Sequence, residues 1–321
     1  MSTERQGEVY DLGYQRYDGP REGRRRAQRA IFENGVRTVL GLGRGPKAKI
    51  LPILLLVGAM LPAFIFIIIL SLTGDGGADF IPGHGDYYQV IATILLIFSA
   101  IMAPELLVSD RRDNIIHLYL VRPLTATDYV LGRFLAFFVI VLALAYSGQI
   151  LLLGGLLLTS SDPWQYLQDN WADIPRFLAA GVLVALFITI IPMAVASFIN
   201  RRAYAAVVVI GLFFISSGVA NGLTSHSETC HEITDQNGRG VSFECTQADE
   251  PVAGDAAKWF ALISVGDVPT RINNMIFDRE AGSPAEAAAA ELHDSIPIGV
   301  YALFTVLPGF LMWWRYQRIR V

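Results

Sequence analysis

The sequence predicts an all-α polytopic membrane protein that crosses the bilayer six times, and two observations support this. Of the 321 residues, 53% are hydrophobic and only 17% are charged, whereas soluble domains carry roughly 25% charged residues. The apolar residues also gather into six long runs with almost no charge, and about 20 such residues cross a bilayer as a helix. These runs are 50–72, 87–107, 134–161, 177–200, 203–227 and 295–314.

The first 49 residues form a basic arm that precedes the first run. Its residues 24–40 repeat apolar side chains at approximately helical spacing: Ala27, Ile31, Val36 and Leu40. A basic amphipathic helix suits the inner membrane surface, with its arginines among anionic lipid headgroups. A disordered basic arm is the alternative. Because a polar, basic stretch is the wrong start for a secretory leader, the first run is expected to anchor the chain.

The distribution of basic residues predicts the topology. Eleven of the 25 Lys and Arg residues precede residue 50, and nine more lie in 111–133, at 201–202 and in 315–320. The other side of the six spans receives only Arg176 and the four basic residues of the loop 223–294. An excess of Lys and Arg in short loops marks the cytoplasmic side. Both termini are therefore expected in the cytoplasm, with the chain in a bacterial plasma membrane.

The loop 223–294 is predicted to be a small extracytoplasmic domain. It holds 13 acidic residues, both cysteines of the chain, and an Asn237-Gly238 pair typical of a hairpin turn. A bridge between Cys230 and Cys245 would close a loop of about 15 residues and contribute roughly 3 kcal/mol. Two free thiols in a reducing compartment are the alternative.

Residues for catalysis or proton relay are sparse in the spans. None of the five histidines lies in a span, which disfavours histidine-dependent intramembrane hydrolysis. The glycines around Pro46-Lys47 do not fit a phosphate-binding loop. His226 and His231 beside two glutamates are better explained as solvated loop residues than as metal ligands. We expect no catalytic residue, no metal site, no cofactor on this chain and no nucleic-acid partner.

The stretch 110–123, DRRDNIIHLYLVRP, places an apolar patch between charged residues in a loop expected on the cytoplasmic side. A short helix with such a patch can fit a groove on another protein. A helix that rests on the lipid interface would show the same pattern.

The sequence from Asp113 to Phe134 resembles the cytoplasmic segment of type-2 ABC transporter permeases. In that family an apolar pair leads to Pro-Leu, then a polar gap, then Gly-Lys or Gly-Arg at the start of the next span. The matching positions here are Leu118-Tyr119-Leu120, Pro123-Leu124, Thr125 to Asp128, and Gly132-Arg133. Where the family usually has Gly-Thr, this chain has Asp113-Asn114.

The resemblance implies a permease subunit of an ATP-driven exporter, paired with a second permease chain, identical or homologous. Two cytoplasmic ATPase subunits would bind the ATP and Mg. The stretch 110–123 would be the coupling helix, with a second contact at the turn after the fourth span. The residues implied in ATPase coupling are Asp110, Arg111, Arg112, Ile115, Ile116, Leu118, Tyr119, Arg122, Pro123, Arg201 and Arg202. Those implied along the substrate path are Phe98, Phe213, Phe214 and Asn221.

Four regions follow from this reading: an arm (1–49), five spans (50–222), the outer loop (223–294), and the sixth span with a basic tail (295–321). The substrate is unknown, and the apolar spans favour an amphipathic or lipid-like molecule. A second hypothesis is a membrane scaffold or tether whose outer loop binds a partner. A membrane enzyme is a third, disfavoured by the missing acid–base residues.

Overall fold

The computed structural model describes residues 23–43, 45–73, 82–113, 115–120, 124–234 and 241–318. Six helices in these residues are long and apolar enough to cross a membrane, which confirms the predicted number of spans. They are α2 (Lys47–Thr73), α3 (His84–Arg112), α5 (Ala126–Thr159), α7 (Asp173–Phe198), α8 (Arg202–Thr224) and α12 (Ser295–Gln317).

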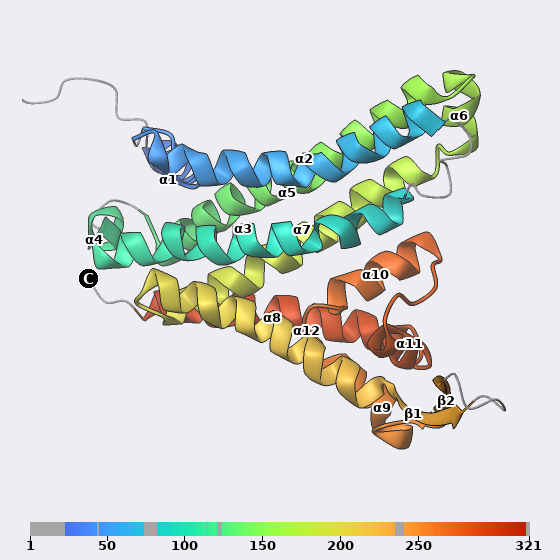
Figure 1. Cartoon of the computed structure of the whole chain (residues 1–321). Helices are drawn as coiled ribbons and strands as arrows, with labels where there is room; N and C mark the ends of the chain where they lie inside the picture. The colour runs from blue at the N-terminus through green and yellow to red at the C-terminus, as the bar shows by residue number, and fades with distance from the viewer. Residues whose placement is uncertain are drawn as a thin grey trace, which may run out of the picture.

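The long helices run back and forth between two ends of the molecule (Figure 1). One end carries α1 (Gly23–Val39), α4 (Ile115–Leu120) and the last residues of α12, and we refer to it as the α4 end. The other carries α6 (Pro163–Asp169) and a β-hairpin, and we refer to it as the α6 end. The most apolar windows of α3 and α7 are 61% and 67% buried, against 11% in α2. The core therefore lies around α3 and α7.

Tyrosine hydroxyls connect the spans within this core. Tyr87 on α3 donates to the Ala59 carbonyl of α2 at 2.7 Å, and Tyr88 donates to the Phe177 carbonyl of α7 at 2.7 Å. Tyr301 on α12 donates to the Leu183 carbonyl of α7 at 2.8 Å. Apolar surface alone does little to hold helices together in lipid, so packing and interhelical hydrogen bonds carry more of the association.

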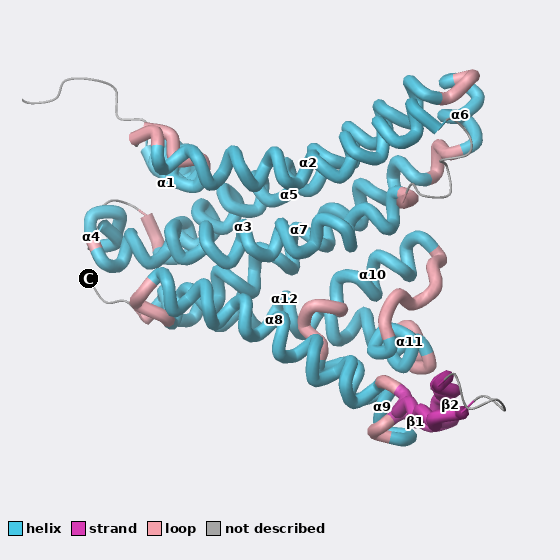
Figure 2. Tube along the Cα trace, viewed as in Figure 1, coloured by secondary structure: helices cyan, strands magenta, loops and turns pink. Residues whose placement is uncertain are grey.

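The elements at the α6 end include some that the sequence did not predict. The short helix α6 begins after Asp162, whose carboxylate accepts hydrogen bonds from the backbone N–H groups of Trp164 and Gln165. The predicted hairpin is present as β1 (His226–Thr234) and β2 (Val241–Pro251), paired antiparallel (Figure 2). Its turn falls outside the described residues.

The segment after the hairpin packs into the helix bundle. It contains η2 (Gly254–Ala256), α9 (Ala257–Phe260), η3 (Ala261–Ile263), α10 (Val268–Phe277) and α11 (Pro284–Ala290). Val268 and Ile272 of α10 are buried, and α10 packs against α7, α12 and α3. The Asn273 side chain donates to the Gly85 carbonyl at 2.7 Å, which ties α10 to the start of α3.

Candidate functional site

At the α4 end, a buried ion pair joins the end of α3 to the start of α5. The Arg133 Nη2 and Asp110 Oδ2 atoms are 2.6 Å apart, and the two side chains are 1% and 8% exposed. Tyr129, one turn before Arg133, donates its hydroxyl to the same Oδ2 atom at 2.8 Å. Desolvated charges are retained in proteins when they are paired and hydrogen-bonded in this way.

The helix α4 packs onto this ion pair through Tyr119, and its Ile116 lies in the apolar core. Ile116 is only 4% exposed. The Arg133 guanidinium lies 5.9 Å from the Tyr119 ring centroid and 5.8 Å from that of Tyr129, so the two rings share one cation. The Tyr119 hydroxyl also accepts a hydrogen bond from Asn34 of α1 at 3.2 Å. A displacement of α4 would therefore disturb α1, α3 and α5 together.

Arginines join other helix ends at the same end of the molecule. Arg111 donates to the backbone carbonyls of Ala196, Ser197 and Ile199, where α7 ends. A cation at this position satisfies carbonyls that have no partner within the helix and complements the helix dipole. Arg202, the first residue of α8, forms an ion pair with Glu105 of α3.

The predicted coupling residues thus divide into two groups. The first group makes contacts within the chain and comprises Asp110, Arg111, Ile116, Tyr119 and Arg202. Arg112 and Arg201 are exposed, and Ile115 is partly exposed. The side chain of Leu118 lies outside the described part of the chain, as do Arg122 and Pro123.

Hydrogen bonds and an ion pair to Asp128 attach α1 to α5, and the sequence analysis missed them. Arg24 contacts both carboxylate oxygens of Asp128, the shortest distance being 2.7 Å, and Gln28 donates to the Asp128 Oδ1 atom at 2.7 Å. Asp128 also completes a capping box with Thr125 at the start of α5. The Thr-x-x-Asp pattern was a visible signal for the cap, but it does not identify the partner on α1.

Close approach of the two helices depends on glycine. A Cβ atom on Gly35 would lie 2.6 Å from the Ala136 Cβ, and one on Gly132 would lie 2.8 Å from the Ile31 Cγ2. The apolar face of α1 that the sequence predicted therefore packs on α5 at Ile31. Its placement at a membrane surface stays a prediction.

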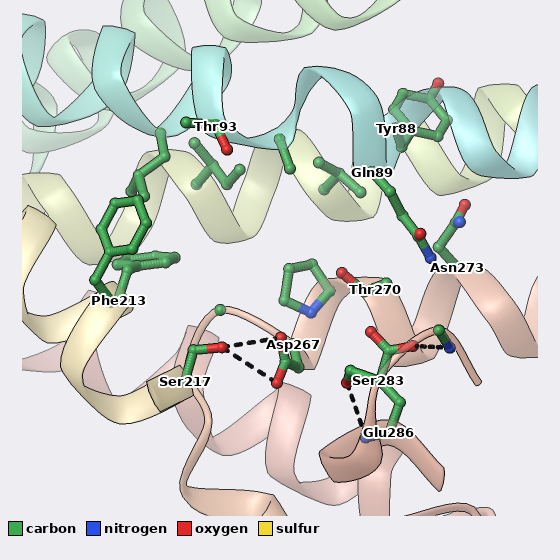
Figure 3. Close-up of a pocket in the computed structure, with 18 residues that line it drawn as sticks. Tyr88, Gln89, Thr93, Phe213, Ser217, Asp267, Thr270, Asn273, Ser283 and Glu286 are labelled. Carbon is green, nitrogen blue, oxygen red and sulfur yellow. Dashed lines mark hydrogen bonds between the residues drawn. The ribbon is translucent and has the colours of Figure 1, made fainter. Parts of the chain in front are cut away.

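Nearer the α6 end, a cavity of about 320 Å³ opens between α3, α7, α8 and the α10–α11 segment (Figure 3). Of the residues predicted on a substrate path, Phe213 and Phe214 line this cavity. Phe98 does not; its ring stacks on Phe137 of α5 with centroids 6.0 Å apart. Asn221 is also outside the lining and binds Ser217 and the backbone of Ala285.

Two carboxylates lie at the polar side of this cavity. Asp267 accepts hydrogen bonds from the hydroxyls of Ser264 and Ser217. The Glu286 Oε2 atom accepts from Asn274 at 3.1 Å and from the Gly282 N–H at 2.8 Å. Burial raises the pKa of the Glu286 carboxyl.

Arg271 lies near these carboxylates and donates to the carbonyls of Ala261 and Ala285. Burial lowers the pKa of its guanidinium. The sequence analysis missed Asp267, Arg271 and Glu286, because nothing in their spacing brings them together before α10 and α11 fold. In the described residues, no group of three or more His, Cys, Asp and Glu side chains could hold a metal ion.

The two cysteines are directly opposite each other in the hairpin, with Cys230 paired to Cys245 in the β1–β2 register. Their side chains fall outside the described portion of the structure. The disulfide therefore stays a prediction.

A comparison with known protein families gives a match. The model of the family described as ABC-2 family transporter protein matches residues 18–263. The matched region begins before α1, includes α4 and the first five spans, and ends at η3. No curated protein matches the chain.

Proposed function

This chain belongs to the ABC-2 family of transporter proteins, and on that premise we propose that it is the permease of an exporter powered by separate ATPase subunits. The ATPases would bind ATP and Mg in the cytoplasm and dock on α4. A second permease chain, identical or homologous, would complete the transmembrane pathway. The cargo would be an amphipathic or lipid-like molecule.

The observation that best supports ATPase coupling is the attachment of α4 to several helices. Ile116 and Tyr119 face the bundle, while Ile115 is partly exposed. Through the Arg133–Asp110 pair, a force on α4 acts on the ends of both α3 and α5. Arg111 and Arg202 extend this connection to α7 and α8. A short helix that contacts α3 and α5, with α3 joined in turn to α7 and α8, is suited to transmit movement of a docked subunit.

The mechanism we propose is a population shift. ATP binding favours closed ATPases, and docked α4 helices favour the permease conformation that fits them. A ligand shifts such an equilibrium only by its differential affinity for the two states. The ATPase must therefore hold α4 differently before and after hydrolysis.

The proposed topology places the α4 end in the cytoplasm of a bacterium and the α6 end outside. The basic residues gathered in α1, beside α4 and in the C-terminal tail favour this orientation. In this orientation α1 lies at the inner membrane surface, and the Cys230–Cys245 hairpin lies outside, where a disulfide can persist.

Co-purification tests the proposed function. We would compare the wild-type chain with Ile115→Asp, since Ile115 is the described apolar residue of α4 that is least engaged with the bundle. The matched control is Val252→Asp, which makes the same kind of change at a residue that is 60% exposed and follows the hairpin. We expect an ATPase with wild type and Val252→Asp, and a strong reduction with Ile115→Asp. If crosslinked wild-type protein yields no ATPase, the exporter assignment fails and the scaffold hypothesis gains support.

A further inference from the structure

The cavity at the α6 end is apolar on one side and acidic on the other. The wall from the core spans is mainly apolar, with Leu96, Ile188 and Phe213. The same spans also contribute the polar side chains of Gln89, Thr93 and Ser217. The opposite wall comes from the α10–α11 segment and includes Asp267 and Glu286. Figure 3 shows Phe213 at one side and Glu286 at the other. Such a cavity matches a molecule with an apolar body and one polar end.

The carboxylates of Asp267 and Glu286 make the polar side negative, and among the described residues no direct ion pair neutralises them. No Lys, Arg or His is found among the described residues that line the cavity. Within the described residues, neither Asp267 nor Glu286 forms a salt bridge. The nearby Arg271 directs Nη2 to the backbone carbonyls of Ala261 and Ala285 instead. Burying a carboxylate without a counter-ion costs free energy, and a bound cation would reduce this cost.

The buried side-chain amide of Asn273 is a second observation that favours a bound ligand at the same wall. Asn273 lines the cavity and is only 1% exposed. Its Nδ2 atom donates to the Gly85 carbonyl, but its Oδ1 atom has no hydrogen-bond partner among the described residues. Buried polar atoms are normally hydrogen-bonded, so an unpaired acceptor here adds a further site for a donor.

We propose that this cavity binds amphipathic monocations, with the apolar body against Phe213 and Leu96 and the cationic centre beside Asp267 and Glu286. The inference rests on the proposed function to the extent that such molecules would be the cargo. The aromatic ring favours a cation with an aromatic body, and a volume of about 320 Å³ limits it to a compact molecule. An anion of the same size is excluded by the charge of the two carboxylates.

Two probes of similar shape and opposite charge give the sharpest test. Tritiated benzyltrimethylammonium, which has an aromatic body and one cationic end, is titrated onto the full-length permease in lipid nanodiscs, with empty nanodiscs subtracted. Phenylmethanesulfonate, which has the same body and one anionic end, is tested in parallel. We expect saturable binding of the cation and no saturable binding of the anion. Equal uptake of both ions would overturn the proposal without requiring any variant.

Variants then locate the binding. Asp267→Asn and Glu286→Gln should each weaken benzyltrimethylammonium binding about tenfold, as expected when a cation loses one close carboxylate. Asp278→Asn and Glu280→Gln are the matched controls, because both residues are exposed and outside the cavity lining. Unchanged affinity in both cavity variants would overturn the site. Size-exclusion profiles identify any variant that misfolds, and the comparison of the two ions on wild type does not depend on them.

The same preparation separates this inference from the proposed function. An ATPase that co-purifies with a permease unable to bind benzyltrimethylammonium overturns only the monocation site. Binding of benzyltrimethylammonium by a permease that never recovers an ATPase overturns the exporter assignment and supports the site.

Discussion

Asp110 and Arg133 form a buried ion pair between two spans, with 2.6 Å between Oδ2 and Nη2. We predict that Asp110→Asn lowers the free energy of unfolding by about 3 kcal/mol, because it leaves a buried guanidinium without its counter-ion. The lost ion pair should also loosen α4, since Tyr119 packs on the same guanidinium. The thermal unfolding midpoint in mild detergent measures the loss.

The matched control for this variant is the neighbouring exposed ion pair. Arg112 and Asp113 are 3.6 Å apart and their side chains are 72% and 49% exposed, so Asp113→Asn should cost about 0–1 kcal/mol. The double variant Asp110→Leu/Arg133→Met should recover much of the stability, since no buried charge remains. If Asp110→Asn melts at the same temperature as Asp113→Asn, the buried pair is not important for stability.

The contact between α1 and α5 leaves no space for a side chain at Gly35. A Cβ atom there would be 2.6 Å from the Cβ of Ala136. We predict that Gly35→Val costs about 1–3 kcal/mol through overpacking and detaches α1. Limited trypsin digestion measures the detachment of α1, because the arginines of α1 should be cleaved several times faster once the helix no longer packs on α5. At Gly45 a Cβ atom would meet nothing within 4 Å. A Gly45→Val variant cut as fast as Gly35→Val would show that the contact is unimportant.

The spans could be predicted because their signal is local. A run of about 20 apolar residues needs no partner to be recognised. The side-chain contacts could not be predicted in this way. Asp110 looked like part of a charged rim because it adjoins two arginines in sequence, yet its partner is Arg133 on the next span. The visible clue was that both charges fall at the same end of adjacent spans.

Helix geometry decides which of the residues predicted on a substrate path line the cavity. In α3 the cavity is lined by a single face that includes Tyr88, Ala92 and Leu96, which lie about one turn apart. Phe98 falls two residues beyond Leu96, on a different face, and packs on α5 instead. The acidic wall depends on Asp267 and Glu286, which only the tertiary packing of α10 and α11 brings together.

The hairpin register makes a direct prediction for the cysteines. Directly opposite residues in antiparallel strands have Cα atoms about 4.5–5.5 Å apart, within the range that a disulfide spans. Cys230 and Cys245 are such a pair. We expect a maleimide reagent to modify neither thiol in the native protein and both after reduction, as read by mass. Modification of both thiols without a reductant would show that the bridge is absent and would weaken the extracytoplasmic placement of the hairpin.

The buried carboxyl of Glu286 makes stability depend on pH. Burial is the largest cause of its raised pKa, with the charge of Asp267 acting in the same direction and Arg271 acting against it. A carboxyl whose pKa is higher in the folded state stabilises the fold at pH values below its unfolded pKa, and this contribution is lost as pH rises through the folded pKa. Glu286→Gln cannot ionise at this position. The thermal unfolding midpoint of this variant should therefore rise relative to that of wild type as the pH increases from acid to neutral.

Thermal unfolding midpoints across pH measure this effect, with Glu280→Gln as the exposed control. The control should follow the wild-type curve at every pH, because the Glu280 side chain is exposed to solvent and its surroundings change little on unfolding. The two glutamine variants remove the same charge, so a difference between them reports the environment of Glu286 alone. Parallel curves for wild type and Glu286→Gln would mean that Glu286 is hydrated in the protein, and the acidic wall of the cavity would then resemble open solvent.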